Sequence, residues 1–129
     1  MWFLLGIMFM HFLSDFVMQT DWQALNKSKN NKALSGHVLS YSLSMTAGFA
    51  LLIILFDVHI QSLLNWVFLL VIFFVITFAT HFATDYVTSR VNTYLWSRNR
   101  HLFFVSVGFD QFIHCATLFI TLYLLGIVS

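Results

Sequence analysis

Four long apolar segments constrain the fold of this 129-residue chain more than any other feature. They cover about residues 2–20, 34–56, 63–88 and 107–128. Each is close to the roughly 20 residues that a helix needs to cross the hydrocarbon of a bilayer. A segment of that length in lipid is helical, because a helix satisfies its own backbone hydrogen bonds. The sequence therefore predicts an all-α integral membrane protein, a four-helix bundle that forms a single transmembrane domain over residues 1–129.

The composition agrees with this fold class. Hydrophobic residues make up 60% of the chain and charged residues 9%, whereas a soluble domain has about 25% charged residues. There is no proline, so we expect uninterrupted helices. The single cysteine, Cys115, excludes an internal disulfide. The sequence has no nucleotide-binding loop, and it predicts no nucleic-acid partner.

The basic residues predict the orientation of the helices. All six lie between the first and second segments or around the connection of the third to the fourth: Lys27, Lys29, Lys32, Arg90, Arg98 and Arg100. By the positive-inside rule both loops are cytoplasmic, so both termini lie outside. The N-terminal segment has no basic leader, and we expect a retained membrane helix rather than a signal peptide. These features predict a multi-pass protein of the cell (inner) membrane whose basic loops contact anionic lipid, and the small size also allows a homodimer.

Two copies of the spacing His-x-x-x-Asp stand inside these apolar segments. The copies are His11–Asp15 and His81–Asp85, and each is followed by a basic loop and a further helix with a histidine near its start. In the fourth segment the spacing is reversed, as Asp110–His114, and the second segment begins near His37. The repeated order predicts two duplicated helical hairpins that meet around a pseudo-twofold axis along the membrane normal.

Ionisable residues in hydrocarbon are costly and are usually functional. Residues four apart lie on one helix face, so each pair can hold one metal ion. Imidazole and carboxylate ligands suit zinc above all, with manganese or iron as other divalent candidates. The expected ligands are His11, Asp15, His37, His81, Asp85, Asp110 and His114. Seven groups could hold two metals, or one metal whose imidazoles are oriented by aspartates.

Two other interpretations of the same residues stay open. Buried His–Asp pairs can relay protons or line an ion pathway, and they can also hold helices together through hydrogen bonds alone. Three further polar residues are candidates for contact with a substrate, namely Gln19, Arg90 and Gln111. Arg90 in particular is suited to steer a phosphate group, because arginine makes bidentate contacts with phosphate.

The motifs His11-Phe-Leu-x-Asp15-Phe-x-x-Gln19, His81-Phe-x-x-Asp85-Tyr and Asp110-Gln-x-x-His114 resemble those of a family of small bacterial and phage membrane proteins of unknown function. The resemblance covers nearly the whole chain and implies four membrane helices. More distantly, the helix-borne His and Asp residues are similar to those of membrane-bound metal-dependent hydrolases of the YdjM type. That similarity implies a hydrolase.

The sequence thus favours a metal-dependent hydrolase that acts on a lipid-borne or membrane-adjacent phosphoester or ester at the cytoplasmic side. The catalytic candidates are Asp15, Asp85 and Asp110, of which one not bound to metal could act as general base. One alternative is a transporter of a metal ion, a proton or a small solute. Another is a non-catalytic membrane interaction protein, stabilised by a structural metal or by a His/Asp network.

Overall fold

The computed structural model describes residues 1–128, and these residues are helical apart from short connections. The elements in chain order are α1 (Trp2–Phe12), the π-helix η1 (Leu13–Val17), α2 (Asp21–Asn26), α3 (Asn31–Leu55), α4 (Leu63–Trp96) and α5 (Arg100–Leu124). Within the described range there is no β-strand. The all-helical fold class predicted from the sequence is confirmed.

Each helix after η1 begins at a polar residue that caps its first turn. Thr20 forms a capping box with Gln23 at the start of α2. The side chains of Asn30, Ser62 and Asn99 accept hydrogen bonds from the first backbone N–H groups of α3, α4 and α5. Because such caps satisfy donors that a helix end leaves unpaired, the connections between the apolar segments fix where the long helices begin.

Three helices are long and apolar enough to cross a membrane, namely α3, α4 and α5. The first apolar helix is shorter, because α1 and η1 together end at Val17. At a rise of 1.5 Å per residue these 16 residues span about 24 Å, whereas the hydrocarbon core is about 30 Å thick. In contrast, the 34 residues of α4 extend over about 51 Å.

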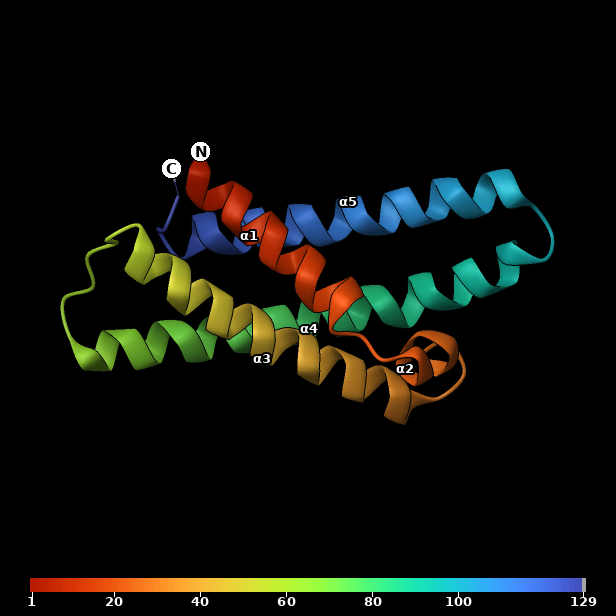
Figure 1. Cartoon of the computed structure of the whole chain (residues 1–129), viewed down its shortest axis with the longest axis horizontal. Helices are drawn as coiled ribbons and strands as arrows, with labels where there is room; N and C mark the ends of the chain where they lie inside the picture. Colours follow the sequence, from red (N-terminus) through yellow and green to blue (C-terminus); the bar gives the residue numbers. More distant parts are fainter. Residues whose placement is uncertain (129) are drawn as a thin grey trace.

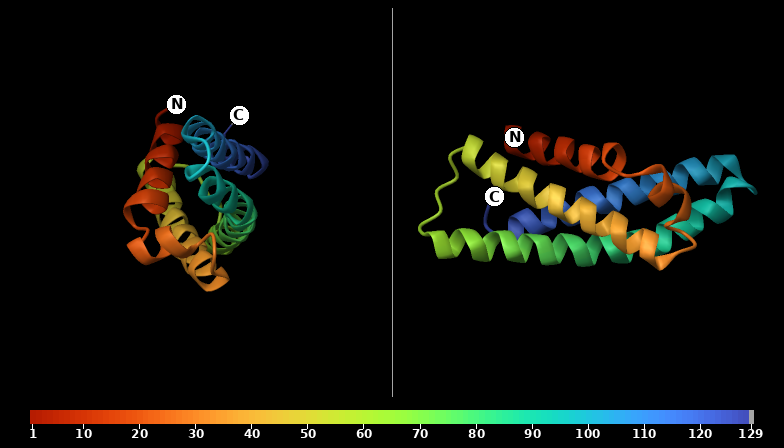
Figure 2. Two further views of the ribbon diagram at one scale, coloured as in Figure 1. Left: turned by 90° about the vertical axis from the view of Figure 1, so that its right-hand side faces the viewer. Right: turned by 60° about the horizontal axis from the view of Figure 1, so that its bottom comes forward.

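The long helices lie side by side along the longest axis of the molecule (Figure 1). Helix α3 packs against α1 and α4, and α4 packs against α5. Both termini and the connection between α3 and α4 lie toward one end, whereas α2 and the connection between α4 and α5 lie toward the other (Figures 1 and 2). The paired ends of α4 and α5 extend beyond the other helices at that second end (Figure 1).

The apolar core lies toward the end that holds the termini. It contains Ile7 of α1, Phe49 of α3, Phe73 of α4 and Leu122 of α5, all 0% exposed. The outward sides of the helices expose other large apolar side chains, among them Phe68, Val75, Phe112 and Ile120. Exposed apolar surface on this scale is typical of helices that face lipid, as expected for a membrane protein.

The helix bounds differ from those expected. The expected first segment, about 2–20, contains a π-helix and ends early, because Thr20 caps a separate helix. Helix α5 begins at Arg100 rather than near 107, since Asn99 caps it. The two His-x-x-x-Asp motifs also stand in unlike surroundings, the first at the junction of α1 with η1 and the second within α4. The duplicated hairpins and the four-span bundle stay predictions.

Candidate metal centre

Seven buried His and Asp side chains from every helix except α2 come together in the interior. The first two lie at the end of α1 and in η1, the next in α3, two in α4 and two in α5. Their exposed fractions are 4% for His11, 4% for Asp15, 0% for His37, 2% for His81, 2% for Asp85, 9% for Asp110 and 2% for His114. We call these residues the His/Asp cluster.

A local change of helix type contributes to this arrangement. Residues Leu13–Val17 form a π-helix that continues directly from α1 and ends in the connection to α2. Ser14 and Asp15 are its buried residues, so the carboxylate of Asp15 enters the cluster near the end of this short first helix. Single π-helical turns are rare and frequently occur at functional sites.

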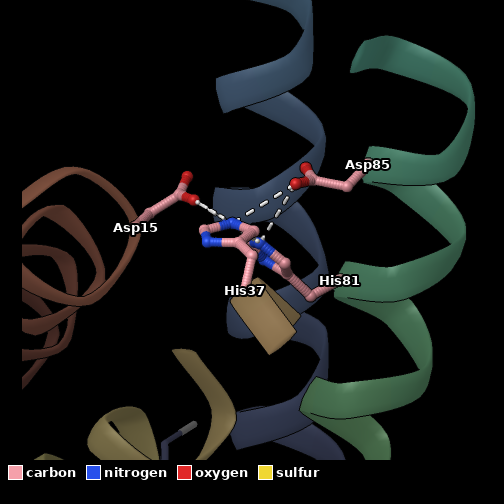
Figure 3. Close-up of side chains that lie close together, drawn as sticks. All are labelled: Asp15, His37, His81 and Asp85. Carbon is pink, nitrogen blue, oxygen red and sulfur yellow. Dashed lines mark hydrogen bonds and ion pairs between the residues drawn. The ribbon is translucent and has the colours of Figure 1, made fainter. Parts of the chain in front are cut away.

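Asp15, His37, His81 and Asp85 form the first group of the cluster, and one potential ligand atom of each lies within 4.8 Å of the others. The two carboxylates approach from opposite sides, with the two imidazole rings between them (Figure 3). Nε2 of His37 is 3.1 Å from Oδ1 of Asp15 and 3.3 Å from Oδ2 of Asp85. Nε2 of His81 is 3.5 Å and 3.7 Å from the same two oxygens, and the two Nε2 atoms are 3.2 Å apart.

These separations match the edges of a metal-ion coordination shell. A tetrahedral zinc ion with bonds of about 2.1 Å to nitrogen and oxygen sets its ligand atoms about 3.4 Å apart. Oδ1 of Asp15 has no hydrogen-bond partner, although Nε2 of His37 lies close to it. The four atoms therefore lie around one position, and hydrogen bonds among them do not satisfy all four. This arrangement is the one expected of metal ligands.

Asp85, Asp110 and His114 form a second group. Nε2 of His114 is 3.1 Å from Oδ1 of Asp85 and 3.4 Å from Oδ1 of Asp110. Oδ1 of Asp110 is buried and has no hydrogen-bond partner. Asp85 therefore belongs to both groups, with Oδ2 directed to the first and Oδ1 to the second. A carboxylate shared in this way can bridge two metal ions.

His11, which the sequence predicted as a ligand, lies in neither group. Its Nδ1 is 3.0 Å from the hydroxyl of Tyr41, and its Nε2 is 3.1 Å from the amide oxygen of Gln111. The amide nitrogen of Gln111 donates to Oδ2 of Asp15 at 3.4 Å and to Oδ2 of Asp110 at 3.3 Å. Because the amide oxygen can only accept, His11 donates from Nε2 and accepts from Tyr41 at Nδ1.

This chain of hydrogen bonds has a consequence for the two aspartates. In Asp15 and in Asp110, Oδ2 accepts from Gln111 while Oδ1 is free of hydrogen bonds and belongs to one of the two groups. Outer hydrogen bonds of this kind orient the ligands of metal sites. Gln111 therefore orients both carboxylates from outside the two groups, and His11 in turn donates a hydrogen bond to Gln111.

Ring stacking fixes the orientation of His81. Its ring stacks on Tyr41 with centroids 3.7 Å apart and on His114 with centroids 4.2 Å apart. Nδ1 of His37 and Nδ1 of His81 have no hydrogen-bond partner. Packing rather than hydrogen bonding therefore directs the Nε2 atom of His81 into the first group.

Lys27 is a member of the site that the sequence analysis missed. It follows α2, and its Nζ donates to Oδ2 of Asp85 at 2.8 Å and lies 3.4 Å from Nε2 of His37. Because Lys27 lies in a basic loop, the sequence predicted that it contacts lipid. The capping signal Thr20-x-x-Gln23 could have indicated the short helix before it, but no local signal gives the direction in which α2 turns.

The charges of the site favour a divalent cation. Asp15, Asp85 and Asp110 contribute three carboxylates, and Lys27 contributes one ammonium group. With neutral imidazoles, this leaves an excess of two negative charges among residues that are almost wholly buried. Because an uncompensated charge in a low-dielectric interior is very costly, bound metal would stabilise this arrangement.

The remaining candidates from the sequence lie apart from the cluster. Arg90 is half-buried, stacks over the ring of Tyr86 and donates to Oδ1 of Asn31 at 3.1 Å. Gln19 is half-buried just after η1, and its Oε1 has no hydrogen-bond partner. Of the three residues proposed for substrate contact, Gln111 is the one whose described hydrogen bonds reach the cluster.

Comparisons with known proteins place the chain in a family. No curated protein and no solved structure matches it. A family model described as "Protein of unknown function (DUF3307)" matches residues 3–129, which is almost the whole sequence. The chain therefore belongs to the DUF3307 family of proteins of unknown function.

Proposed function

We propose that this protein is a membrane-embedded, metal-dependent hydrolase that acts on a lipid-borne or membrane-adjacent phosphoester or ester at the cytoplasmic side. The observation that carries the proposal is the sharing of Asp85 between two groups of buried ligand atoms. Zinc is the metal we expect, because both groups offer imidazole nitrogen and carboxylate oxygen. Manganese or iron accepts the same ligands.

The two groups differ in a way that suggests different roles. Structural zinc sites usually have four protein ligands, whereas catalytic sites have three and keep one position open. The first group would supply four ligands, from Asp15, His37, His81 and Asp85, whereas the second would supply three, from Asp85, Asp110 and His114. We therefore assign the chemistry to the second group.

The chain's own residues support hydrolysis at that position. A pair of divalent metals supplies an activated water and stabilises the attacking and leaving oxygens. The side chain of Asp110 is 13% exposed, compared with 5% for Asp15 and 2% for Asp85. Asp110 is therefore the aspartate that water reaches most readily, and its Oδ2 would accept a proton from water while Oδ1 serves as the metal ligand. Gln111 would hold it in position and also contact the substrate, while Gln19 and Arg90 would contact parts of the substrate that extend beyond the cluster.

The placement of apolar side chains favours hydrolysis over transport. An ion pathway through the molecule would have to pass the core around Ile7, Phe49 and Phe73, which lies on the terminal side of the cluster. All six basic residues lie toward the opposite end, which supports an orientation in the inner membrane with the basic loops in the cytoplasm.

The test is a hydrolysis assay on protein reconstituted into lipid vesicles with zinc. A panel of phospholipids and ester lipids is incubated with the protein, and mass spectrometry measures the released products. We expect product that disappears after chelation and in His114→Ala, and that persists in the control Asp57→Asn, whose site is an exposed loop. Full metal occupancy without product from any lipid would contradict the hydrolase.

The same vesicles separate the two alternatives. Metal-ion or proton flux that requires Asp85 would instead indicate a transporter. If chelation unfolds the protein and no reaction or flux is seen, the centre is a structural element of a membrane interaction protein. Cross-linking in the same vesicles determines whether the protein forms a homodimer.

A further inference from the structure

A pocket of about 420 Å³ lies beside the His/Asp cluster. Its walls come from α2 and the turn after it, from the last turns of α4 and from the start of α5. Lys27 lines this pocket and also contacts Asp85. The pocket and the candidate metal centre therefore share a side chain.

The lining of the pocket has a basic polar part and an apolar part. The charged residues that line it are Lys27 and Lys29, and no carboxylate lines it. Trp96 and Phe103 supply aromatic surface, and their rings meet edge to face with centroids 4.9 Å apart. Such a lining suits a ligand that carries an anionic group on an apolar body.

Two buried polar atoms in the lining have no partner. The hydroxyl of Ser89 is one of them, and this residue is 8% exposed. Ser89 lies four residues after Asp85, on the same face of α4. Oδ1 of Asn92 is the other unpartnered atom. Because buried polar groups are normally satisfied, these atoms indicate a polar ligand, with Ser89 as a donor and Asn92 as an acceptor for a lysine ammonium.

Lys27 would respond to metal in the first group. Its Nζ lies 3.4 Å from Nε2 of His37 and 2.8 Å from Oδ2 of Asp85, which are both candidate ligand atoms. A divalent cation bound by those atoms would repel the ammonium group at this short range. The side chain of Lys27 is 19% exposed, and the pocket is the space that it already lines.

We propose that this pocket binds the phosphate group of a membrane amphiphile and that Lys27 couples this binding to the metal centre. The proposal rests on the proposed function, because the phosphate would be that of the substrate class. In the metal-free protein Lys27 pairs with Asp85. When metal is bound, Lys27 turns into the pocket, where its ammonium and the Ser89 hydroxyl hold the phosphate while Trp96 and Phe103 contact the apolar chain. Each ligand then strengthens binding of the other.

The test measures binding rather than turnover, in nonionic detergent by calorimetry. The probes are dihexanoyl phosphatidic acid, inorganic phosphate and dihexanoylglycerol, each added to zinc-loaded and to metal-free protein. We expect the phosphatidic acid to bind more tightly than either other probe, and more tightly with zinc than without it. If dihexanoylglycerol binds as tightly as the phosphatidic acid, the pocket does not recognise the phosphate group and the proposal fails. If inorganic phosphate binds as tightly as the phosphatidic acid, the pocket does not recognise the apolar chain and the proposal fails.

Substitutions of Lys27 separate the coupling role from a structural one. Hydrogen bonds to charged groups are strong enough that Lys27→Met should weaken binding of the phosphatidic acid about 10- to 100-fold. The same change removes a cation that competes with metal, so zinc affinity should rise. Lys27→Arg should keep the binding of the amphiphile, and Lys32→Met, at an exposed site outside the pocket, should change neither affinity. A loss of both affinities in Lys27→Met would mean that Lys27 is a structural ion-pair partner, and the proposal would fail.

The binding experiment tests this inference and the hydrolysis assay tests the proposed function, so one proposal can be rejected while the other is kept. Amphiphile binding that depends on Lys27, without any hydrolysis, would retain this inference and reject the hydrolase. Hydrolysis that is unchanged in Lys27→Met would retain the hydrolase and reject this inference.

Discussion

At the scale of single residues, the amide of Gln111 orients two of the three carboxylates in the cluster. It donates to Oδ2 of Asp15 and to Oδ2 of Asp110, so that Oδ1 of each residue is left for the candidate metal groups. Its oxygen accepts from His11, which in turn accepts from Tyr41. A single chain of hydrogen bonds thus runs from the Tyr41 hydroxyl through the His11 imidazole and the Gln111 amide to the two carboxylates.

Removal of the amide tests this role. In Gln111→Leu both aspartates lose a donor, and their carboxylates are free to rotate. Loss of an outer hydrogen-bond partner typically lowers metal affinity about 10- to 100-fold, and we expect a change of that size in zinc titrations with the same final stoichiometry. The control is Gln61→Leu in the exposed connection between α3 and α4. Unchanged zinc affinity in Gln111→Leu would show that the carboxylates are held by other contacts.

At the scale of helices, the sequence predicts the long elements well and the short ones poorly. Apolar length and the caps at Asn30, Ser62 and Asn99 are local signals, so α3, α4 and α5 could be anticipated. The π-helix has no such signal, and the capping signal Thr20-x-x-Gln23 indicates the start of α2 but not the direction in which this helix runs. Both η1 and α2 pack against α3, and such tertiary packing is not encoded in a local sequence pattern.

Glycine permits the close approach of α1 to α3. A Cβ atom on Gly48 of α3 would lie 2.8 Å from Cγ of Met10 in α1, too close for normal packing. We expect Gly48→Leu to push the helices apart and to lower the free energy of unfolding by about 1–3 kcal/mol, as overpacked cores do. Thermal unfolding in detergent measures the effect.

The matched control for that substitution is Gly108→Leu in α5. A Cβ atom at Gly108 would have no neighbour within 4 Å, so this change adds the same side chain to open space. Equal melting temperatures for the two variants would contradict the close packing of α1 on α3.

At the scale of the whole molecule, the seven His and Asp residues could be predicted from the sequence. That six of them form two groups and that His11 lies in neither could not be predicted. Their spacing within apolar segments marks them as buried and as neighbours on one helix face. Asp85 belongs to both groups because of how α4 is rotated relative to α3 and α5. His11 lies in neither group because its Nε2 bonds to Gln111, which is 100 residues away in sequence. Lys27 was missed because a basic loop residue has an ordinary explanation at the lipid surface.

The predicted orientation of the molecule is testable with single cysteines. In a Cys115→Ala background, Ser28→Cys and Ser97→Cys place thiols in the two basic connections, and Gln61→Cys places one in the connection between α3 and α4. A membrane-impermeant maleimide should label the first two in inverted vesicles and the third in right-side-out vesicles. Labelling of Ser28→Cys and Ser97→Cys from opposite sides would refute the orientation.

We propose that Asp85 would bridge two metal ions, and the number of metal ions bound per chain tests this proposal most directly. Mass spectrometry of bound metal should find two ions in each wild-type chain purified in detergent and reconstituted with zinc. His114→Ala should retain one ion, because only the second group is damaged, and Asp85→Asn should retain less than one. The control Asp57→Asn should retain two. A wild-type protein without metal, or two ions in His114→Ala, would contradict the account.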